Sequence, residues 1–510
     1  MKLLPSPIKP LTRLPTPLVC CVILLLVFII FGLVGIDFGK HWDEPKLLRS
    51  VENAYLSQRF LPGWYQYPSF TFWVGLLSKY LTVGVHALSG VEVSLTIMWR
   101  SIMITITGLS GLWTYLLALR ISHRQSVALI APALLMLSPE LLYHSRWIAP
   151  DALMMQLGIA STLVLHLSFN HTRHSFQRLL QASVLAGLAC STKYPGGLFI
   201  VPIILISPML LTKHHTWATR LIRCTAPIGL FTFTVLLTTP GILLETGQFL
   251  ADVNSEINHY RRGHATYGVT PGLSHLWLNL RYLLLCLSDV IWVQILLSIS
   301  IISGYIQIAR SDKKTIITVL IVPSIYLLYF STQRVMIVRN LLVLLPFMVI
   351  LGAMGLQTIA QKLPVNKRIW ALAGLTFALM QTQTNFLSAR SINRTADVRT
   401  DLASFVLNNP HLEIRPSTKL STDPLVEVLS DSPKSDIHRI MVVFWSDERR
   451  QIPWVTNHAQ RYIIISGQHD VNWSYYPSWL GGRRLLAVSL SDAVKMGLVK
   501  QVPQSASPPQ

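Results

Sequence analysis

The stretch LVCCVILLLVFIIFGLVGI, residues 18–36, is an uninterrupted apolar run that leads directly into DFGKHWDEP, residues 37–45. A run of about 20 apolar residues is long enough to cross a bilayer as a helix. The first predicted membrane helix therefore delivers Asp43 and Glu44 to the water on its far side. Because carboxylates are costly when they slip into lipid, we expect that something other than anchoring keeps them there. The loop after the first helix is where the sequence predicts chemistry.

The composition indicates a multi-pass membrane protein. Of the 510 residues, 51% are hydrophobic and only 13% are charged, whereas about 25% of an ordinary soluble chain is charged. Lys2, Lys9 and Arg13 precede the first apolar run, but the run is too long for a signal peptide and no small-residue cleavage site follows it. We therefore expect an uncleaved first span. Stretches of sufficient length predict about eleven spans, near residues 18–36, 95–119, 127–143, 151–169, 179–193, 196–212, 224–240, 287–309, 315–331, 340–359 and 369–387.

The net charge of +20, from 43 basic and 23 acidic residues, is explained by basic loops on one side of a bilayer. In a soluble protein this charge would indicate a nucleic-acid partner, but no interleaved basic and aromatic motif is present. If residues 69–90, which contain Lys79 and His86, lie along the surface as an amphipathic helix, five basic loops share the cytoplasmic side with the N-terminus. These loops are Arg120 to Arg124, His171 to Arg178, Lys213 to Arg223, Arg310 to Lys314 and Lys362 to Arg368. The C-terminus then lies outside. If residues 69–90 cross the membrane, the same loops turn outward.

Residues 391–510 differ in composition from the apolar part and predict a small soluble domain. Apolar runs at Ile440 to Trp445, Tyr462 to Ser466 and Leu485 to Leu490 are typical of strands in a mixed α/β domain. The five cysteines lie in or beside apolar spans, so neither a disulfide framework nor a zinc ribbon is expected in this tail. The predicted fold class is an all-α polytopic membrane protein with a small α/β extracytoplasmic C-terminal domain. Its predicted parts are a cytoplasmic tail at 1–17, a transmembrane domain at 18–390 with large outer loops at 37–94 and 241–286, a soluble domain at 391–502 and a disordered, Pro- and Ser-rich end at 503–510.

Asp43 has two interpretations. Apolar residues recur at helical spacing after it, so Asp43 occupies a helix N-cap with Pro45 in the first turn, and a purely structural cap is the simpler interpretation. A cap also fixes a carboxylate and stabilises its charged form. An ionised carboxylate held beside a membrane pocket can accept a proton from an alcohol or an amine. The local sequence leaves both interpretations open.

Further charges fall on the same predicted outer face, at Arg146, Asp151, Lys193, Arg334 and Arg339. Structural alternatives exist: an arginine can reach the lipid headgroups from a helix end, and the charged segment 249–264 has the composition of a solvated helix. Arginines at an outer helix end nevertheless run against the positive-inside tendency. A lipid-linked phosphate would explain them, because a guanidinium binds phosphate oxygens in a bidentate way. Charges gathered at one surface favour an interfacial reaction site over a transporter, which places them at mid-span.

Taken in order, these motifs resemble the GT-C membrane glycosyltransferases, in particular the bacterial branch related to protein O-mannosyltransferases and the lipid A aminoarabinose transferase. The resemblance covers about residues 18–410 and the strand at 462–466. Its motifs are Asp43-Glu44 after the first helix, Tyr67-Pro68-Ser69, Ser145-Arg146 with Pro150-Asp151, Thr192-Lys193-Tyr194, Arg339 ahead of Pro346-Phe347, and Asp397-Val398-Arg399. The Asp-Glu pair is the most specific of them. Close relatives of the aminoarabinose transferase carry Glu-Lys-Pro-Pro-Leu where this chain has QYPSF at 66–70, so a metal site, sugar or acceptor tied to that motif is not carried over.

The resemblance implies transfer of a sugar from a polyprenyl-phosphate donor to a lipid, glycan or protein acceptor at the outer face of the inner (plasma) membrane, with inversion at the anomeric carbon. Asp43 would accept the acceptor proton, while Glu44 and Asp151 would orient the acceptor or support the site. The donor phosphate would be bound by Arg146, Lys193, Arg339 and Arg334. The acceptor or sugar pocket would include Asp37, His41, Tyr67, Tyr194 and His264. The expected partners are the lipid-linked donor, membrane lipids and the acceptor, without nucleic acid.

No cofactor is expected. His41, Asp43, Glu44 and His264 contain metal-ligating atoms, but their spacing is too loose to predict a metal, and no Gly-rich phosphate loop is present. Two other function classes stay open: a flippase or transporter of lipid-linked glycans, which would need paired charges at mid-span, and a non-catalytic scaffold whose tail binds a partner.

Overall fold

The computed structural model describes residues 16–37, 44–169, 174–211, 216–263, 268–288, 290–363, 398–418, 439–447, 462–466 and 483–499, with single residues at 374, 376, 377, 380 and 429. The chain divides into two compact units. Unit 1 comprises Met1–Leu33 and Leu47–Asn385, and unit 2 comprises Val34–Lys46 and Phe386–Gln510.

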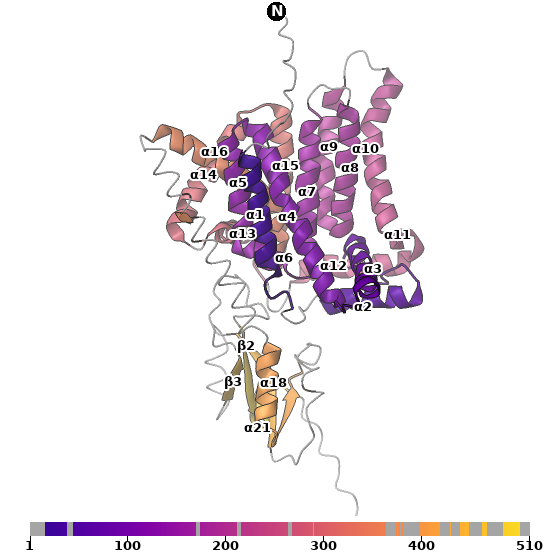
Figure 1. Ribbon diagram of the computed structural model, residues 1–510, viewed down its shortest axis with the longest axis vertical. Helices are drawn as coiled ribbons and strands as arrows, with labels where there is room; N and C mark the ends of the chain where they lie inside the picture. Colours follow the sequence, from indigo (N-terminus) through magenta and orange to yellow (C-terminus); the bar gives the residue numbers. More distant parts are fainter. Residues whose placement is uncertain are drawn as a thin grey trace, which may run out of the picture. The chain divides into compact units, whose positions relative to one another are not determined.

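Unit 1 is a bundle of helices (Figure 1). The helix α2 begins in unit 2 and continues into unit 1. The elements are α1 Thr16–Leu33, α2 Glu44–Ser57, α3 Phe70–Ser89, α4 Leu95–Ser122, α5 Gln125–Met136, α6 Pro139–Ser145, α7 Pro150–Leu167, α8 Ser175–Thr192, η1 Tyr194–Phe199, α9 Ile200–Ile206, η2 Ser207–Leu210, α10 Trp217–Thr238, α11 Gly241–Leu244, α12 Thr246–Arg262, α13 Leu273–Leu287, α14 Ile291–Ala309, α15 Lys313–Ser331, η3 Val338–Leu344 and α16 Leu345–Lys362.

Six helical segments among the described residues are long and apolar enough to cross a membrane, and a bent pair makes a seventh. The six are α1, α4, α10, α14, α15 and η3 with α16. The prediction of a multi-pass membrane protein is confirmed, whereas the eleven spans stay a prediction. The predicted span at 369–387 falls almost wholly outside the described residues. The helix α3 is not among the six, and the surface position expected for residues 69–90 stays a prediction.

The predicted span at 127–143 is broken rather than continuous. Its residues form α5 and α6, whose axes differ by 58°. Pro139 begins α6, where a residue without an N–H is tolerated, and Ser138 caps the new helix by accepting a hydrogen bond from the Leu141 amide at 3.2 Å. The Ser138 hydroxyl also donates to the backbone oxygen of Cys286 in α13. Because α5 and α6 together are apolar enough for one span, the hydropathy pattern does not predict this break.

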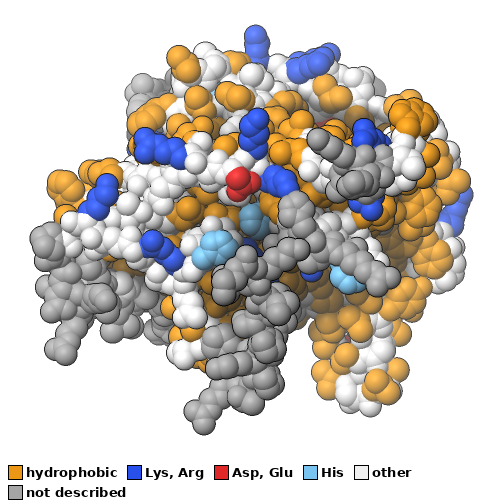
Figure 2. Space-filling model, turned by 90° about the horizontal axis from the view of Figure 1, so that it is seen from above, with side chains coloured by type: hydrophobic (Ala, Val, Ile, Leu, Met, Phe, Trp, Pro, Cys, Tyr) orange, Lys and Arg blue, Asp and Glu red, His pale blue; other side chains and the backbone are white. Residues whose placement is uncertain are grey.

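One end of unit 1 gathers several of the basic turns. Lys314, at the start of α15, lies over the ring of Phe169 beyond α7, with 5.6 Å between ammonium and ring centroid. Arg223 of α10 lies 5.2 Å from the ring of Phe176 in α8. Lys and Arg side chains spread over the face seen in Figure 2, where carboxylates are sparse. The basic turns between α7 and α8 and between α14 and α15, and the start of α10, therefore meet at the same end.

The opposite end of unit 1 is built from shorter, more polar elements. The 18 residues of α7 carry the chain about 27 Å away from the basic turns, at 1.5 Å per residue. At this end the buried Tyr65 amide donates to Asp252 at 2.7 Å, and its hydroxyl donates to Glu245 at 2.5 Å. Burial, and next the hydrogen bond to Glu245, raise the pKa of Tyr65, so the hydroxyl keeps its proton. A side chain at position 241 would place its Cβ 2.0 Å from the Tyr65 hydroxyl oxygen, which explains Gly241. Contacts around Tyr65 thus fasten α12 to the segment before α3.

Unit 2 contains a four-stranded sheet, and the predicted small C-terminal sheet is confirmed. The strands are β1 Leu412–Pro416, β2 Arg439–Asp447, β3 Tyr462–Ser466 and β4 Arg483–Ser489, with helices α18 Val398–Asn408 and α21 Leu490–Lys495. The order is β1-β2-β4-β3, with β1 parallel to β2 and the other pairs antiparallel. The sequence predicts strands β2, β3 and β4, whereas it does not predict the short β1.

The alternation of side chains along β2 explains the two cores of unit 2. Met441 and Val443 pack in a cluster with Leu402 and Val406 of α18. Val442 and Phe444, on the other face, pack in a cluster with residues that include Ala493 of α21. Successive side chains of a strand point to opposite faces, so a sheet covered on both sides needs apolar residues at every position. The continuous apolar run of β2 meets that requirement.

Candidate functional site

Three charged side chains meet where α7 begins, α8 ends and η3 lies. Lys193 Nζ is 2.6 Å from Asp151 Oδ1, and Arg339 Nε is 3.3 Å from Asp151 Oδ2. The second contact is an ion pair whose N–H is not aligned for a hydrogen bond. The side chains of Asp151, Lys193 and Arg339 are only 1%, 5% and 8% exposed. Buried charges are stable when they are paired, and here two cations share one carboxylate.

Asn340 fixes the position of the Lys193 ammonium. Its side-chain oxygen accepts a hydrogen bond from Lys193 Nζ, and its side-chain nitrogen donates to the Tyr260 hydroxyl at 2.8 Å. Its backbone oxygen accepts from the Tyr326 hydroxyl, also at 2.8 Å. The amide can form both side-chain bonds in only one orientation. Asn340 therefore connects the charges to α12, which carries Tyr260, and to α15, which carries Tyr326.

Aromatic rings surround the Arg339 and Lys193 head groups. Arg339 Nη2 donates to the Tyr67 hydroxyl at 2.9 Å, and its guanidinium carbon lies 5.2 Å from the Trp147 ring centroid. Lys193 Nζ lies 5.7 Å from the Tyr67 ring centroid. Cations are attracted to the faces of aromatic rings at such distances. Tyr67 consequently contacts both cations, one through its hydroxyl and one through its ring.

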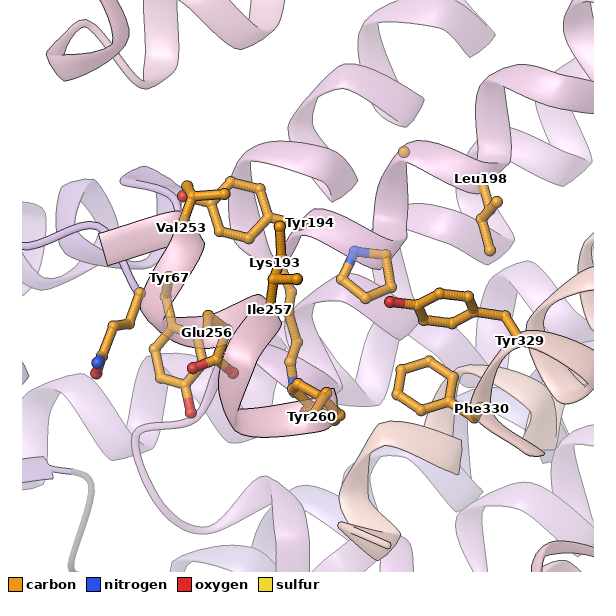
Figure 3. Close-up of a pocket in the computed structure, with 13 residues that line it drawn as sticks. Tyr67, Lys193, Tyr194, Leu198, Val253, Glu256, Ile257, Tyr260, Tyr329 and Phe330 are labelled. Carbon is orange, nitrogen blue, oxygen red and sulfur yellow. The ribbon is translucent and has the colours of Figure 1, made fainter. Parts of the chain in front are cut away.

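A pocket of about 430 Å³ lies beside Lys193. Lys193, Tyr67 and Glu256 lie toward one side of the view in Figure 3, and Leu198, Tyr329 and Phe330 lie toward the other. One wall is a face of α12, whose residues 253, 256, 257 and 260 share the spacing of a single helix face. The lining residues are Gln66, Tyr67, Lys193, Tyr194, Pro195, Gly197, Leu198, Val253, Glu256, Ile257, Tyr260, Tyr329 and Phe330. The pocket thus has a polar and an apolar end.

The break between α8 and α9 places Lys193 and Tyr194 at this pocket. Lys193 adopts an extended backbone conformation at the end of α8, and the chain continues as the short helix η1. At position 196 a Cβ atom would lie 2.3 Å from the Ala189 carbonyl oxygen, so only glycine fits there. Tyr194 lines the pocket, and its hydroxyl donates to the Tyr65 backbone oxygen at 2.6 Å. The predicted interruption at 191–197 is therefore present, and its polar residues face other parts of the site.

Of the predicted phosphate-binding residues, the structure brings Lys193 and Arg339 together and places two others elsewhere. Arg146 is buried where α6 ends, and its Nε donates to the backbone oxygen of Gly32 in α1 at 3.2 Å. It does not line the pocket. The side chain of Arg334 is exposed. Its backbone amide donates to the backbone oxygen of Tyr260 at 3.1 Å. The predicted phosphate-binding roles of Arg146 and Arg334 stay predictions.

The predicted acidic loop belongs mostly to unit 2. Asp37 is exposed there, and Glu44 is fully buried at the first position of α2. His41, Asp43 and His264 lie outside the described residues. Their predicted roles stay predictions. Among the residues that the structure describes, no three His, Cys, Asp or Glu side chains are grouped as metal ligands would be, and the expectation of a metal-independent reaction stays an expectation.

Four residues at the site are not predicted from the sequence. They are Trp147, Glu256, Tyr260 and Asn340. Asn340 directly follows Arg339, and Trp147 directly follows Arg146. Their position next to a predicted site residue is a weak sequence signal that they belong to the site. Glu256 and Tyr260 lie on α12, whose charged sequence resembles that of a solvated helix. Burial, and next the charge of Glu256, raise the pKa of Tyr260, which indicates that both groups belong to the same polar environment.

The comparisons with known proteins agree with this architecture. A model of the dolichyl-phosphate-mannose-protein mannosyltransferase family matches residues 74–238, from within α3 to the end of α10. The crystal structure of ArnT from Cupriavidus metallidurans in the apo state matches 93% of this chain and 98% of that chain, with a TM-score of 0.52 and 13% sequence identity. The chain has the GT-C glycosyltransferase fold.

A second structure with the GT-C fold, the same ArnT bound to undecaprenyl phosphate, matches the same shares of the two chains with a TM-score of 0.50 and 13% identity. No curated protein matches the sequence. The resemblance to the GT-C glycosyltransferases that the motifs predict is therefore confirmed for the fold. At this identity the fold is what the chains share, and the chemistry has to be argued from the site.

Proposed function

We propose that the protein is a membrane glycosyltransferase that moves a sugar from a polyprenyl-phosphate carrier to a lipid, glycan or protein acceptor at the outer face of the plasma membrane. The observation that carries this proposal is the group formed by Asp151, Lys193 and Arg339 beside a pocket with a polar and an apolar end. The GT-C fold and a relative of the same fold with bound undecaprenyl phosphate support it.

The charge of this group suits a lipid-linked phosphate. Two cations and one carboxylate sum to a net charge of +1, and the phosphodiester that joins a sugar to a polyprenol carries one negative charge. The two cations attract an anion, so the phosphodiester would bind at the head groups of Lys193 and Arg339. Arg339 would contribute a planar fork of donors and Lys193 a compact ammonium. Asp151 would hold both cations in place rather than act on the sugar.

The two ends of the pocket match the two parts of such a donor. Leu198, Pro195 and Phe330 supply apolar contact for the first isoprene units. Lys193 marks the phosphate position, and Tyr67, which contacts both cations, lies beside it. The volume of about 430 Å³ is within the range of small-molecule sites, so it would take the phosphate, the sugar and the start of the chain, with the remaining isoprenoid in lipid.

The reaction would need a leaving group and a base. The acceptor oxygen or nitrogen attacks the anomeric carbon, the bond from that carbon to the phosphate oxygen breaks, and the electron pair leaves with polyprenyl phosphate. Attack from the face opposite the phosphate inverts the configuration. Cations that stabilise the leaving phosphate lower the barrier without a general acid. Asp43, in the role that the resemblance to the GT-C glycosyltransferases implies, would accept the acceptor proton.

The test is a transfer assay with the full chain in liposomes. The donor is an undecaprenyl-phosphate hexose with a labelled sugar, and the acceptors are a lipid, glycan and protein extract of a bacterial envelope. We expect label to move to an acceptor with release of undecaprenyl phosphate. The variant Lys193→Met, which keeps the aliphatic stem and removes the charge, should lose most of this transfer.

The control is Arg310→Ala, which removes an exposed cation beyond α14 and should leave transfer unchanged. Movement of intact donor across the bilayer without transfer would instead indicate a flippase. A wild-type protein that neither binds undecaprenyl phosphate nor transfers label would exclude the proposed function. Equal transfer by the Lys193→Met protein would remove Lys193 from the donor site.

A further inference from the structure

The carboxylate of Glu256 at the polar end of the pocket has no role in the reaction described so far. It lines the same pocket as Lys193 and Tyr260 and lies on the face of α12 that forms one wall. In Figure 3 its head group lies on the same side as Tyr67 and Lys193, away from Leu198 and Phe330. Its charge acts on Lys193, Tyr194 and Tyr260. A carboxylate in this position faces the part of a donor that is attached to the phosphate.

The sum of the charges at the polar end of the pocket indicates which sugars it accepts. Among the described residues that line the pocket, Lys193 is the single cation and Glu256 the single carboxylate. Asp151 pairs with Lys193 and with Arg339, so these three groups carry +1 and the sum including Glu256 is zero. A bound phosphodiester brings the sum to −1. A sugar with its own carboxylate would bring it to −2, and a sugar phosphate would make it more negative still, with no further cation at the described pocket lining to compensate.

We infer that Glu256 is a specificity-determining residue that accepts hydrogen bonds from the hydroxyl groups of an uncharged sugar and rejects donors whose sugar is anionic. This inference rests on the proposed function. An ionised carboxylate is an acceptor only and has room for several hydrogen bonds from O–H groups. The aromatic rings of Tyr194 and Tyr260 beside it offer apolar surface to the sugar ring. Like charges brought together in a partly buried pocket repel strongly.

The experiment compares two donors that differ in one group, undecaprenyl-phosphate glucose and undecaprenyl-phosphate glucuronic acid. For the wild-type protein we expect kcat/KM for the neutral donor to exceed that for the uronate by at least tenfold. In Glu256→Gln, which has almost the same size, neutral transfer should fall by roughly 10- to 100-fold, the range for loss of a hydrogen bond to a charged group. Transfer or binding of the uronate should rise, so the ratio between donors shrinks.

Two further variants separate charge from structure. Glu256→Asp keeps the charge and should keep the rejection of the uronate, even where neutral transfer falls. Glu92→Gln removes an exposed carboxylate between α3 and α4 and should change neither donor. Because no residue of α12 is fully buried, the Gln and Asp variants are expected to fold. Undecaprenyl phosphate without a sugar should bind to Glu256→Gln at least as tightly as to the wild type.

The outcomes distinguish this inference from the proposed function. If the wild type transfers the neutral sugar and Glu256→Gln leaves the donor ratio unchanged, the role of Glu256 is wrong while the proposed function stands. A wild type that prefers the uronate overturns the inference in the same way. If the wild type binds no undecaprenyl phosphate and transfers neither sugar, the proposed function fails and the inference fails with it.

Discussion

Asp151 and Lys193 form a buried ion pair with 2.6 Å between Oδ1 and Nζ, although Asp151 lies in α7 and Lys193 directly follows α8. The same carboxylate faces Arg339 with its second oxygen. An anion between two cations keeps both at fixed positions, which a site for a phosphate needs before the phosphate arrives. The Asp151 side chain is therefore the centre of the proposed donor site even though it need not touch the donor.

Replacing this carboxylate should destabilise the protein. In Asp151→Asn two buried cations lose their counter-charge, and breaking a buried pair typically costs about 3–5 kcal/mol. We expect a clearly lower apparent Tm for thermal unfolding in detergent and weaker binding of undecaprenyl phosphate. The control Glu92→Gln, at an exposed position, should stay within about 0.5 kcal/mol of the wild type. An unchanged Tm for Asp151→Asn would mean that the pair does not form in the membrane-embedded protein.

Arg339 should act on donor affinity. Arg339→Ala removes charge-assisted hydrogen bonds to the phosphate, so the Kd for undecaprenyl phosphate should rise by about 10- to 100-fold. Arg339→Lys should recover part of the loss, because lysine keeps the charge and lacks the planar fork. Titration of detergent-solubilised protein with undecaprenyl phosphate measures both effects. Arg310→Ala serves as the matched control, and equal affinities for the Arg339→Ala and Arg310→Ala proteins would place the phosphate elsewhere.

We expect substitution of Asp43 to lower the rate of sugar transfer. Asn is nearly as good an N-cap as Asp, so Asp43→Asn keeps the helix start and removes the proton acceptor. As a catalytic base its loss should slow transfer by about 10²- to 10⁴-fold, with expression and undecaprenyl phosphate binding largely kept. The measurement is the single-turnover rate in liposomes. Near wild-type transfer would remove Asp43 from the mechanism, and Glu44 would then be the next residue to test.

The orientation of the chain can be tested with single cysteines. On a background without native cysteines, a cysteine at position 400 or 460 should react with a membrane-impermeant reagent in intact cells, and one at position 215 should not. The physical reason is the concentration of basic turns at one end of unit 1, because basic loops favour the cytoplasmic side of a membrane. Labelling at 215 with protection at 400 and 460 would reverse the proposed topology.

The residue types and the positive-inside tendency predict part of the site from the sequence alone. Asp151, Lys193 and Arg339 are expected on one face because they are charges that the cytoplasmic loops do not account for, and the structure places them in contact. Their catalytic roles stay predictions. The apolar runs likewise predict the helical bundle and three strands of the sheet, since hydrophobic period and length are properties of local sequence.

The rest depends on long-range packing. Nothing local in α12 shows that Glu256 and Tyr260 face a pocket, because that follows from the contacts of Tyr65 with Glu245 and Asp252. The break between α5 and α6 escapes the hydropathy pattern because the two helices together are apolar enough for one membrane span. The double hydrogen bond of Asn340 joins residues from three distant segments. The spacing of residues within one segment does not predict such contacts.

The position of η3 in the chain has a consequence for how the protein is made. Asp151 and Lys193 are synthesised long before Val338–Leu344, which supplies both Arg339 and Asn340. Until η3 has been inserted, the lysine lacks its amide acceptor and the aspartate lacks its second cation. We therefore expect the site to be completed late in biogenesis. A nascent chain that stalls before η3 would hold a neutral Asp–Lys pair in the membrane and no arginine with which to capture a lipid-linked sugar.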